Sequence, residues 1–483
     1  MRAMTEFETV IGLEVHCELS TKTKIFCGCS TKFGAAPNSQ VCPVCLGLPG
    51  TLPVMNAEAL ERAILVGLAV GCTIRRRFKF DRKHYYYPDL PKNFQISQYD
   101  LPLAHDGRVD LAGAHPVRVK RVHLEEDAGK LVHEGAGQQI ATGTAALVDY
   151  NRSGMPLLEI VSEPDLREPA EAVAYVKSLQ TLVRYLHVSD GNMEEGSLRC
   201  DANISVRPKG ADELGAKIEI KNMNSFKSIE HALTFEARRQ RDALARGETL
   251  AQETRLWDDT AGETRSMRSK EAAHDYRYFP EPDLLVFTMD DARLAVIRGR
   301  LPELPWTKRL RYVQTLGLTD YDAGVLTSDR TVAEYFEATI AAGAPPKTAC
   351  NWVSTELLGA LHGRKLGIGD SRVAPRQLAA LIALIDKATI SGKIAKTVFA
   401  EMLVSGADPD AVVKAKGLVQ ITDEDALVTS VRDVLAANPQ SVADFKAGKS
   451  QTIGFLVGQV MKATGGKANP QAVNKILKEE LTR

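Results

Sequence analysis

The sequence contains no apolar run long enough to span a bilayer. Its richest apolar stretch, Ala63 to Cys72, includes two glycines and is far shorter than the ~20 residues that a transmembrane helix needs. No signal or transit peptide is recognisable either, because the patterned sequence begins by Phe7. These absences argue against a membrane-spanning or exported protein, and we expect a cytosolic one.

Net charge is absent too. Lys+Arg and Asp+Glu both number 61, so a nucleic-acid partner would have to be bound by a local basic patch rather than by overall charge. With 44% apolar and 25% charged residues, the 483-residue chain has the composition of an ordinary soluble globular protein. Its length suggests about two to four domains.

Several nucleotide-binding and catalytic motifs are missing. A Walker A loop is absent, since Gly448–Ser450 has Ala443 where the first glycine should stand. Gly135 and Gly137 do not begin a dinucleotide-binding loop, because Ile140 replaces the third glycine. Neither a protein-kinase catalytic loop nor the nucleophile loop of an amidase is present. A chain that used ATP without these motifs would do so with carboxylates and Mg²⁺ on a sheet.

Acidic residues cluster in the stretch RVHLEEDAGK, Arg121 to Lys130. Glu125, Glu126 and Asp127 follow an alternating run, Val117 to Leu124, that predicts a strand. Carboxylates at the end of a strand suit Mg²⁺, which takes oxygen ligands and leaves room for water and phosphate. Because successive strand residues point to opposite faces, Glu125 and Glu126 reach one site only if the strand ends or bulges there. The alternative is a solvated acidic turn.

Two further predicted strands carry site candidates. Residues 7–19 alternate, so Glu14 and His16 share the polar side of a strand, although a half-exposed strand would show the same pattern. Residues 147–163 predict a strand, a turn and a second strand. Glu159 lies between apolar neighbours in that second strand, where a carboxylate needs a metal or a basic partner.

Polar residues are also dense in residues 193–225, which predict two strands joined by a glycine-containing turn. Asn and Asp are poor strand formers, so their abundance favours a ligand-lined sheet over a merely solvated face. The candidates in these strands are Arg199, Asp201, Lys221 and Asn222.

Four of the eight cysteines form two close pairs. Cys27 and Cys29 are separated by twelve residues from Cys42, which is followed by Cys45. Two such pairs can close a tetrahedral thiolate site for zinc, and because all four positions are cysteine the zinc would be structural. The alternative is a group of free buried thiols.

Three tyrosines, Tyr85–Tyr87, lie in a segment with little helical period, Asp81 to Asp100. Aromatic residues interleaved with Lys and Arg can stack on the bases of a single-stranded end. The tyrosines could equally fill core at a loop, and the sequence does not decide between these roles.

Helical patterns appear at three places in the first part of the chain and dominate the remainder. The first of these helices follows Asn56 and extends to about Val70, the second begins at Pro169, and the third covers about 227–246. After about Ala295 the helical segments are 303–316, 331–342, 346–363 and 375–389, and a second helical region begins near 410. We therefore predict domains at 1–294, 295–409 and 410–483.

The C-terminal end is basic. Residues 446–483 contain seven Lys+Arg and two Asp+Glu. Such a surplus suits contact with a phosphate backbone, although a merely soluble surface would have the same composition.

Long motifs give the chain a resemblance to a known family, the B subunit of the tRNA-dependent amidotransferase that acts on Asp-tRNA(Asn) and Glu-tRNA(Gln). The resemblance covers the whole chain. The motifs are IGLEVH (11–16), FDRKHYYYPDLPKNFQISQYD (80–100), HLEEDAGK (123–130), NRSGMPLLEIVSEPD (151–165), MEEGSLRCDANIS (193–205), EIKNMNSF (219–226) and DYRYFPEPD (275–283).

The resemblance implies an activity and a set of partners. Members of this family use ATP and Mg²⁺ to phosphorylate the side-chain carboxyl of a misacylated tRNA, and ammonia then displaces phosphate to give Gln-tRNA(Gln) or Asn-tRNA(Asn). A glutaminase A subunit supplies the ammonia, and a small C subunit wraps the pair. The implied fold class is α+β, with an N-terminal antiparallel-sheet cradle like the glutamine synthetase catalytic fold. A helical domain and a tRNA-gripping tail follow it.

The resemblance also assigns residues. It implies a metal and phosphoryl-transfer site made of Glu14, His16, Glu125, Glu126 and Glu159. The four glutamates would bind magnesium, and His16 would hold a metal-bound water or the substrate. Arg199, Asp201, Lys221 and Asn222 would lie near the nucleotide or an ammonia channel. The quartet Cys27, Cys29, Cys42 and Cys45 resembles the structural zinc site of some members.

Two other classes remain open from the residues. A stand-alone carboxylate–amine ligase acting on a small acid would need no tRNA, and the basic tail argues against it. A non-enzymatic zinc-containing RNA-binding protein would not need Glu14, His16, Glu125, Glu126 and Glu159 together.

Overall fold

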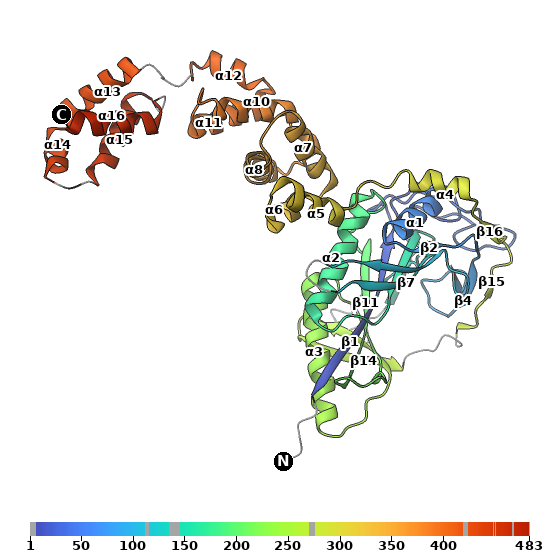
Figure 1. Ribbon diagram of the computed structural model, residues 1–483. Helices are drawn as coiled ribbons and strands as arrows, with labels where there is room; N and C mark the ends of the chain where they lie inside the picture. The colour runs from blue at the N-terminus through green and yellow to red at the C-terminus, as the bar shows by residue number, and fades with distance from the viewer. Residues whose placement is uncertain are drawn as a thin grey trace. The chain divides into compact units, whose positions relative to one another are not determined.

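A nine-stranded sheet forms the centre of the first of two units, Met1–Thr307 and Lys308–Arg483, into which the chain divides in the computed structural model (Figure 1). The structure describes residues 6–111, 115–134, 145–269, 276–418, 424–447, 449, 451–465 and 468–482. In spatial order the strands are β14 (Glu263–Ser269), β13 (Glu253–Asp258), β12 (Ile218–Lys221), β11 (Leu198–Pro208), β1 (Phe7–Glu18), β10 (Pro156–Ser162), β7 (Val117–Glu126), β6 (Ala104–Val109) and β2 (Thr73–Ile74).

The sheet is antiparallel as predicted, with one exception. Strands β12 and β13 pair in parallel. A helix, α3 (Phe226–Ala245), lies between them in the chain, and a parallel pair requires such a crossover connection. The sequence pattern predicted this helix without showing that the two strands it joins are neighbours.

Helices cover one face of the sheet. These are α1 (Ala57–Ala69), α2 (Pro169–Tyr185) and α3, and they share one apolar core with the sheet. Two of their starts match the sequence signals, because the Asn56 side chain accepts hydrogen bonds from the backbone N–H groups of Glu58 and Ala59, and Pro169 opens α2. Ser225, which was not predicted as a cap, caps α3. The opposite face is left to polar side chains.

Three smaller sheets and one further helix complete this unit. They are β15 (Phe279–Pro280), β4 (Asp81–His84) and β5 (Phe94–Ser97); β16 (Phe287–Thr288) and β3 (Arg77–Phe78); β8 (Lys130–Glu134) and β9 (Ala145–Asp149); and α4 (Asp291–Arg298). The predicted turn before β10 contains Gly154 at φ +81°, a left-handed conformation that glycine adopts without strain.

The second unit is helical and contains two separate apolar clusters. One extends from Tyr312 to Val413 and the other from Leu427 to Leu481. Its helices are α5 (Pro305–Leu316), α6 (Asp320–Leu326), α7 (Arg330–Ala341), α8 (Pro346–Asn351), the π-helix η3 (Trp352–Leu357), α9 (Leu358–His362), the 3₁₀ helix η4 (Ile368–Asp370), α10 (Pro375–Asp386), α11 (Gly392–Ser405), α12 (Pro409–Ala415), α13 (Glu424–Ala437), α14 (Pro439–Lys446), α15 (Thr452–Ala463) and α16 (Pro470–Thr482). The first three residues of α5 belong to the first unit, because that unit ends at Thr307.

The helices predicted in 303–389 are confirmed, whereas α6 and α11 were not predicted individually. The proposed domain boundaries near 294 and 409 stay predictions. Asp275 of the motif DYRYFPEPD lies outside the described residues, as do residues 448, 450, 466–467 and 483 of the basic end. Among the described helices, none combines the length and apolar character that a membrane span requires.

Candidate active site

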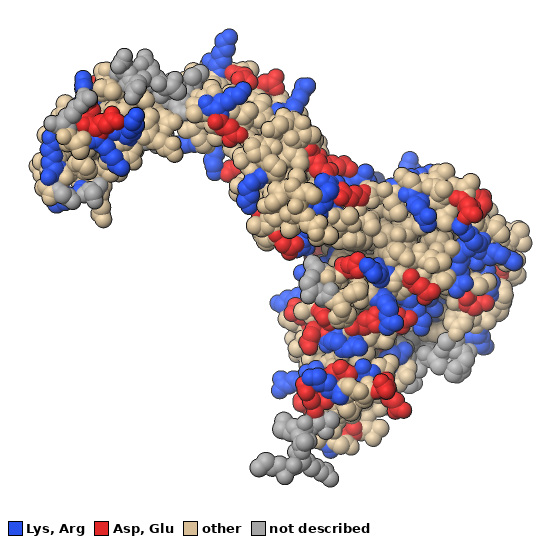
Figure 2. All heavy atoms as spheres, viewed as in Figure 1, with Lys and Arg blue, Asp and Glu red and all other residues tan. Residues whose placement is uncertain are grey.

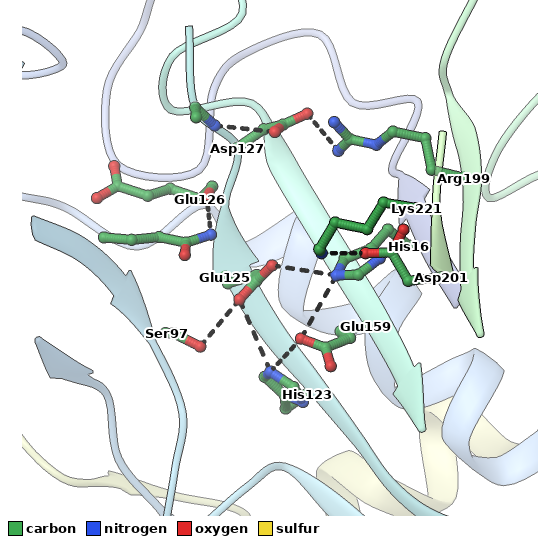
Figure 3. A network of polar contacts seen from close by, with 12 residues as sticks. His16, Ser97, His123, Glu125, Glu126, Asp127, Glu159, Arg199, Asp201 and Lys221 are labelled. Atoms are coloured by element: carbon green, nitrogen blue, oxygen red, sulfur yellow. Dashed lines mark hydrogen bonds and ion pairs between the residues drawn. The ribbon is translucent and has the colours of Figure 1, made fainter. Parts of the chain in front are cut away.

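A row of polar side chains crosses the centre of the sheet on the face opposite the helices (Figure 3). In β1, residues such as Val15 are buried against the helices, so the neighbouring His16 projects from the other face. The antiparallel register sets His16 opposite Glu159 of β10 on one side and Arg199 of β11 on the other. Glu159 in turn lies opposite His123 of β7. Residues far apart in sequence thus meet through strand register.

Four of these side chains form a compact group. Nε2 of His16 lies 3.6 Å from Glu159 Oε2 and 3.8 Å from Glu125 Oε1. Nε2 of His123 lies 3.1 Å from Glu159 Oε2 and 3.8 Å from Glu125 Oε2. Glu125 joins the group because it is two residues beyond His123 on the same face of β7.

The group is buried and its acids are ionised. Burial alone would raise the pKa of Glu159, but the charges and hydrogen bonds of His123 and His16 hold that pKa well below its ordinary value. Burial also opposes ionisation of Glu125, and His123 with Lys83 nevertheless lowers its pKa. Burial disfavours protonation of His16, yet Glu159 and Glu125 raise its pKa to about 9. The two imidazoles therefore offset the unfavourable effect of burial on the two carboxylates.

The three ligand atoms of His16, Glu125 and Glu159 lie within 4.8 Å of one another. Two carboxylate oxygens and one imidazole nitrogen form a donor set that fits a divalent cation, and three protein ligands leave positions for water or phosphate. The Ser97 hydroxyl donates a hydrogen bond to Glu125 Oε2 over 3.0 Å, which orients that carboxylate. This donor set is open, as a catalytic metal site requires.

A lysine and a group of tyrosines border these acids. Lys83 of β4 lies opposite Gln95 of β5, and Gln95 and Ser97 donate hydrogen bonds to Glu126 O and to Glu125 of β7. Lys83 therefore shares the face of the small sheet that is turned toward Glu125. Its Nζ lies 4.9 Å from the ring centroid of Tyr276 and 5.5 Å from that of Tyr85.

No carboxylate lies within ion-pair distance of Lys83 in the part of the chain that the structure describes. Burial opposes its charge, but Tyr278, Glu125, Tyr85 and Glu159 raise its pKa. Aromatic rings thus hold this ammonium group while leaving its N–H donors for a ligand. Tyr85 takes part in that cage, whereas the Tyr86 side chain is 68% exposed, so the three tyrosines differ in role.

The structure does not bring Glu126 to this group. From Arg121 through Glu126 strand β7 keeps a continuous register with β10, so the Glu126 side chain leaves on the side opposite to Glu125 (Figure 3). Glu126 Oε2 accepts a hydrogen bond from Lys92 Nζ over 2.5 Å, and Oε1 accepts one from the backbone N–H of Ile96 over 2.8 Å. Strand β7 ends at Glu126, which is too late to turn both glutamates to one site.

Glu14 lies on the correct face but outside the ligand group. Its Oε1 accepts a hydrogen bond from Asn203 Nδ2 over 2.8 Å. Its cross-strand partner on β11 is Asp201, which accepts a hydrogen bond from Lys221 Nζ over 2.6 Å. Asn222, with φ +68°, donates to the carbonyl of Trp257 over 3.0 Å, so its amide stabilises the end of β12.

Arg199 belongs to a second polar group beside the first. Its guanidinium donates to Asp127 Oδ2 over 2.6 Å, and Arg152 lies 3.5 Å from the same oxygen. Burial would raise the pKa of Asp127, but these two arginines lower it. Glu18 shares a hydrogen bond with Asp127, and burial together with that neighbouring acid raises the pKa of Glu18 to about 8.

The cysteine quartet is brought together as a separate centre. The sulfur atoms of Cys27, Cys29, Cys42 and Cys45 lie within 4.8 Å of one another. The backbone N–H of Cys42 donates to Cys45 Sγ over 3.2 Å, and the buried Lys24 Nζ lies 3.7 Å from that sulfur. These groups stabilise thiolate charge, and four sulfurs fit a closed structural zinc site.

Sequence reasoning missed His123, Ser97 and Lys83. His123 carried a usable signal, since it stands two residues before Glu125 in an alternating strand and must share its face. Ser97 and Lys83 carried none, because only the position of the small sheet β15–β4–β5 relative to β7 sets them beside the acids.

Comparison with known proteins identifies the family. The family model described as the GatB/GatE catalytic domain matches residues 9–295, and that described as the GatB domain matches residues 334–481. The chain belongs to the GatB family. It is 55% identical over 483 residues to the B subunit of the aspartyl/glutamyl-tRNA(Asn/Gln) amidotransferase of Carboxydothermus hydrogenoformans, covering 99% of this chain and 100% of that relative.

Other relatives with the same name also match this chain over nearly its whole length. The protein from Moorella thermoacetica is 55% identical over 480 residues, covering 99% of this chain and 100% of its own. That from Acaryochloris marina is 52% identical over 487 residues, with 99% and 98% covered. The resemblance drawn from the sequence motifs is therefore confirmed along the whole chain.

Proposed function

We propose that the chain uses ATP to phosphorylate the side-chain carboxyl of Glu-tRNA(Gln) or Asp-tRNA(Asn), and that ammonia then gives Gln-tRNA(Gln) or Asn-tRNA(Asn). It acts as the B subunit of a glutamine-hydrolysing amidotransferase, with the glutaminase A subunit and the small C subunit as partners. The observation that carries the proposal is the buried group of His16, His123, Glu125 and Glu159 in a chain that matches proteins of that name over its full length.

Within this site we assign the ligands by geometry. His16, Glu125 and Glu159 would hold Mg²⁺, and Mg²⁺ bound there would offset the negative charge of a transferring phosphoryl group. The lowered pKa of both glutamates keeps them ionised at neutral pH, so they bind a cation without first losing a proton. Nε2 of His16 faces both carboxylates and is the atom that gives up its proton when the cation is bound.

The positions of the other predicted ligands support different roles. Glu14 is bonded to Asn203 and would act on the metal through water, while Glu126 holds Lys92 and is not favoured as a ligand. Arg199, Asp201 and Lys221 remain candidates for the nucleotide or the ammonia path, since they lie on the same polar face of the sheet.

Lys83 supplies the cation that the sequence assignment lacked. The Lys83 ammonium group, which has no ion pair among the described residues, is placed to bind an anion that also touches a metal held by Glu125 and Glu159. The reacting phosphoryl oxygens are such an anion. The rings of Tyr276 and Tyr85 position this charge.

Further proposals concern the fold of the first unit, the cysteine quartet, the basic end of the chain and its location. A glutamine synthetase-like cradle is supported by a mainly antiparallel sheet with helices on one face and acids on the other. Zinc would fill the quartet of Cys27, Cys29, Cys42 and Cys45 and stabilise the loop that carries it. The basic end of the chain would contact tRNA, and the location would be cytoplasmic.

The test is ATP cleavage by the chain with the A and C subunits, measured with and without Glu-tRNA(Gln) or Asp-tRNA(Asn). We expect cleavage to depend on the aminoacylated tRNA, and amide formation to need the A subunit only when glutamine, rather than ammonium, is the nitrogen donor. Cleavage driven by a free small acid without tRNA would favour the stand-alone ligase, and no cleavage under any condition would favour a non-enzymatic RNA-binding protein.

A further inference from the structure

An open hollow of about 890 Å³ on the first unit is lined by four arginines and by none of the site residues described above. The arginines are Arg75, Arg76 and Arg77, which lead from β2 into β3, and Arg298 at the end of α4. Figure 2 shows Lys and Arg gathered over the part of this unit where Figure 1 places β2 and β16.

The fold leaves most of this positive charge without an acidic partner. Arg76 is paired with Asp291, and His105 of the hollow is paired with Asp106. Across the described ranges, no carboxylate lies within ion-pair distance of Arg75, Arg77 or Arg298. The Nε atom of Arg75 is moreover buried and has no hydrogen-bond partner. A buried donor without a partner is costly, so the hollow would gain stability from an anionic ligand.

The same segment of chain connects the hollow with the candidate active site. From Arg75 to Lys83 the sequence is RRRFKFDRK, in which six of nine residues are basic. The N-terminal end of this segment lines the hollow, and its last residue, Lys83, faces the acids of β7. Lys79 and Arg82 in the middle of this segment are paired with acids, so an anionic chain whose reactive end lay in the site would meet the positive charge at the two ends of the segment.

We propose that the hollow lined by Arg75, Arg77 and Arg298 binds backbone phosphates of the RNA substrate. The proposal rests on the proposed function, because it takes the substrate to be an aminoacylated tRNA. Guanidinium groups bind phosphate oxygens in a bidentate manner. Nucleic-acid-binding surfaces are more polar and much more positively charged than protein–protein interfaces, and a hollow with four arginines and no acidic residue among its eleven lining residues matches them.

The decisive variant is the double substitution Arg77→Gln/Arg298→Gln in the full chain. Both side chains are exposed and lack an acidic partner among the described residues, so folding should be preserved, as a melting curve would verify. We expect tRNA affinity to fall about tenfold at low salt, and the slope of log K against log salt to become shallower by roughly one to two units. Arg238→Gln is the control for loss of positive charge elsewhere on the first unit, because Arg238 is 84% exposed on α3, is paired only with the exposed Asp242 among the described residues, and lines no part of the hollow.

Filter binding of tRNA(Gln) and tRNA(Asn) to the wild type, the double variant and the control gives the answer. Equal affinity and equal salt slope in wild type and double variant would overturn the assignment of the hollow. Normal tRNA binding together with weakened ATP binding would make it a nucleotide site, and loss of affinity for the A or C subunit alone would make it a protein interface; both would overturn the proposal. A wild type that bound no tRNA would instead contradict the proposed function.

Discussion

The first unit contains two candidate metal centres that are built in opposite ways. The four cysteines come from one stretch of chain, Cys27 to Cys45, and place four sulfur atoms within 4.8 Å of one another. The second centre takes His16, Glu125 and Glu159 from three strands and leaves part of its surroundings open. A closed set of four thiolates leaves no place for substrate, whereas an open set of oxygen and nitrogen donors does. This difference supports the proposal that the first centre is structural and the second catalytic.

The largest effect should follow loss of a cysteine ligand. In Cys45→Ser, we expect zinc to fall from one equivalent per chain to less than a tenth, with local unfolding of the loop, because structural zinc contributes roughly 10 kcal/mol or more to folding of its site. Elemental analysis and limited proteolysis would measure both. A wild type purified without zinc, with freely titratable thiols in the folded state, would contradict this role.

The two centres also differ in how far the sequence could predict them. Cysteine spacing alone predicted the membership of the quartet, since its residues are neighbours in the chain. Strand alternation predicted that Glu14 and His16 share a face and that Glu159 needs a basic or metal partner, and the structure supplies His16 and His123. Alternation could not say which strands are adjacent, so the meeting of β1, β10 and β7 came from family resemblance.

The sequence also did not show how Glu126, Lys83 and Ser97 lie relative to Glu125, because their positions depend on the three-dimensional arrangement of the strands. Glu126 was grouped with Glu125 on the expectation that the strand would break, but β7 continues through Glu126. Lys83 and Ser97 were missed because they depend on how a second, smaller sheet packs against β7. The polar character of the first unit and the helical character of the second were readable from periodicity, whereas the parallel pair β12–β13 was not.

The open centre should be sensitive to the cation beside it. In Lys83→Met, we expect tRNA-dependent ATP cleavage to fall on the order of thirtyfold, because a desolvated charge that binds phosphoryl oxygens is lost. Lys83→Arg should recover part of the rate, since it keeps the charge over Tyr276. Steady-state kinetics with both variants would measure this, and equal rates in wild type and Lys83→Met would remove Lys83 from the site.

The smallest effect should come from Glu18, beside the open centre. Its pKa of about 8 in the folded protein lies above the ordinary value of 4.5, so the folded state binds more protons than the unfolded state between these values. Stability contributed by this group is therefore lost as the pH rises from about 5 to 8. In Glu18→Gln, the melting temperature should lose this part of its pH dependence, on the order of 1–3 °C. An unchanged pH profile in the variant would show that Glu18 is not the titrating group.

The central claim is that the open centre uses Glu125 and not its neighbour Glu126. Both side chains are 3% exposed, and they leave the same strand on opposite sides, so Glu125→Gln and Glu126→Gln are a matched pair. Resistance to trypsin and melting curves would confirm folding of each variant before kinetics.

The measurement is tRNA-dependent ATP cleavage by both variants at low and high Mg²⁺. We predict that Glu125→Gln lowers the rate on the order of a hundredfold or more and is partly restored by high Mg²⁺, because a metal ligand has lost its charge. Glu126→Gln should lose less than about tenfold, with no dependence on Mg²⁺, because its partners are Lys92 and the backbone of Ile96. Equal, Mg²⁺-dependent losses in both variants, or a near-normal rate in Glu125→Gln, would contradict this account.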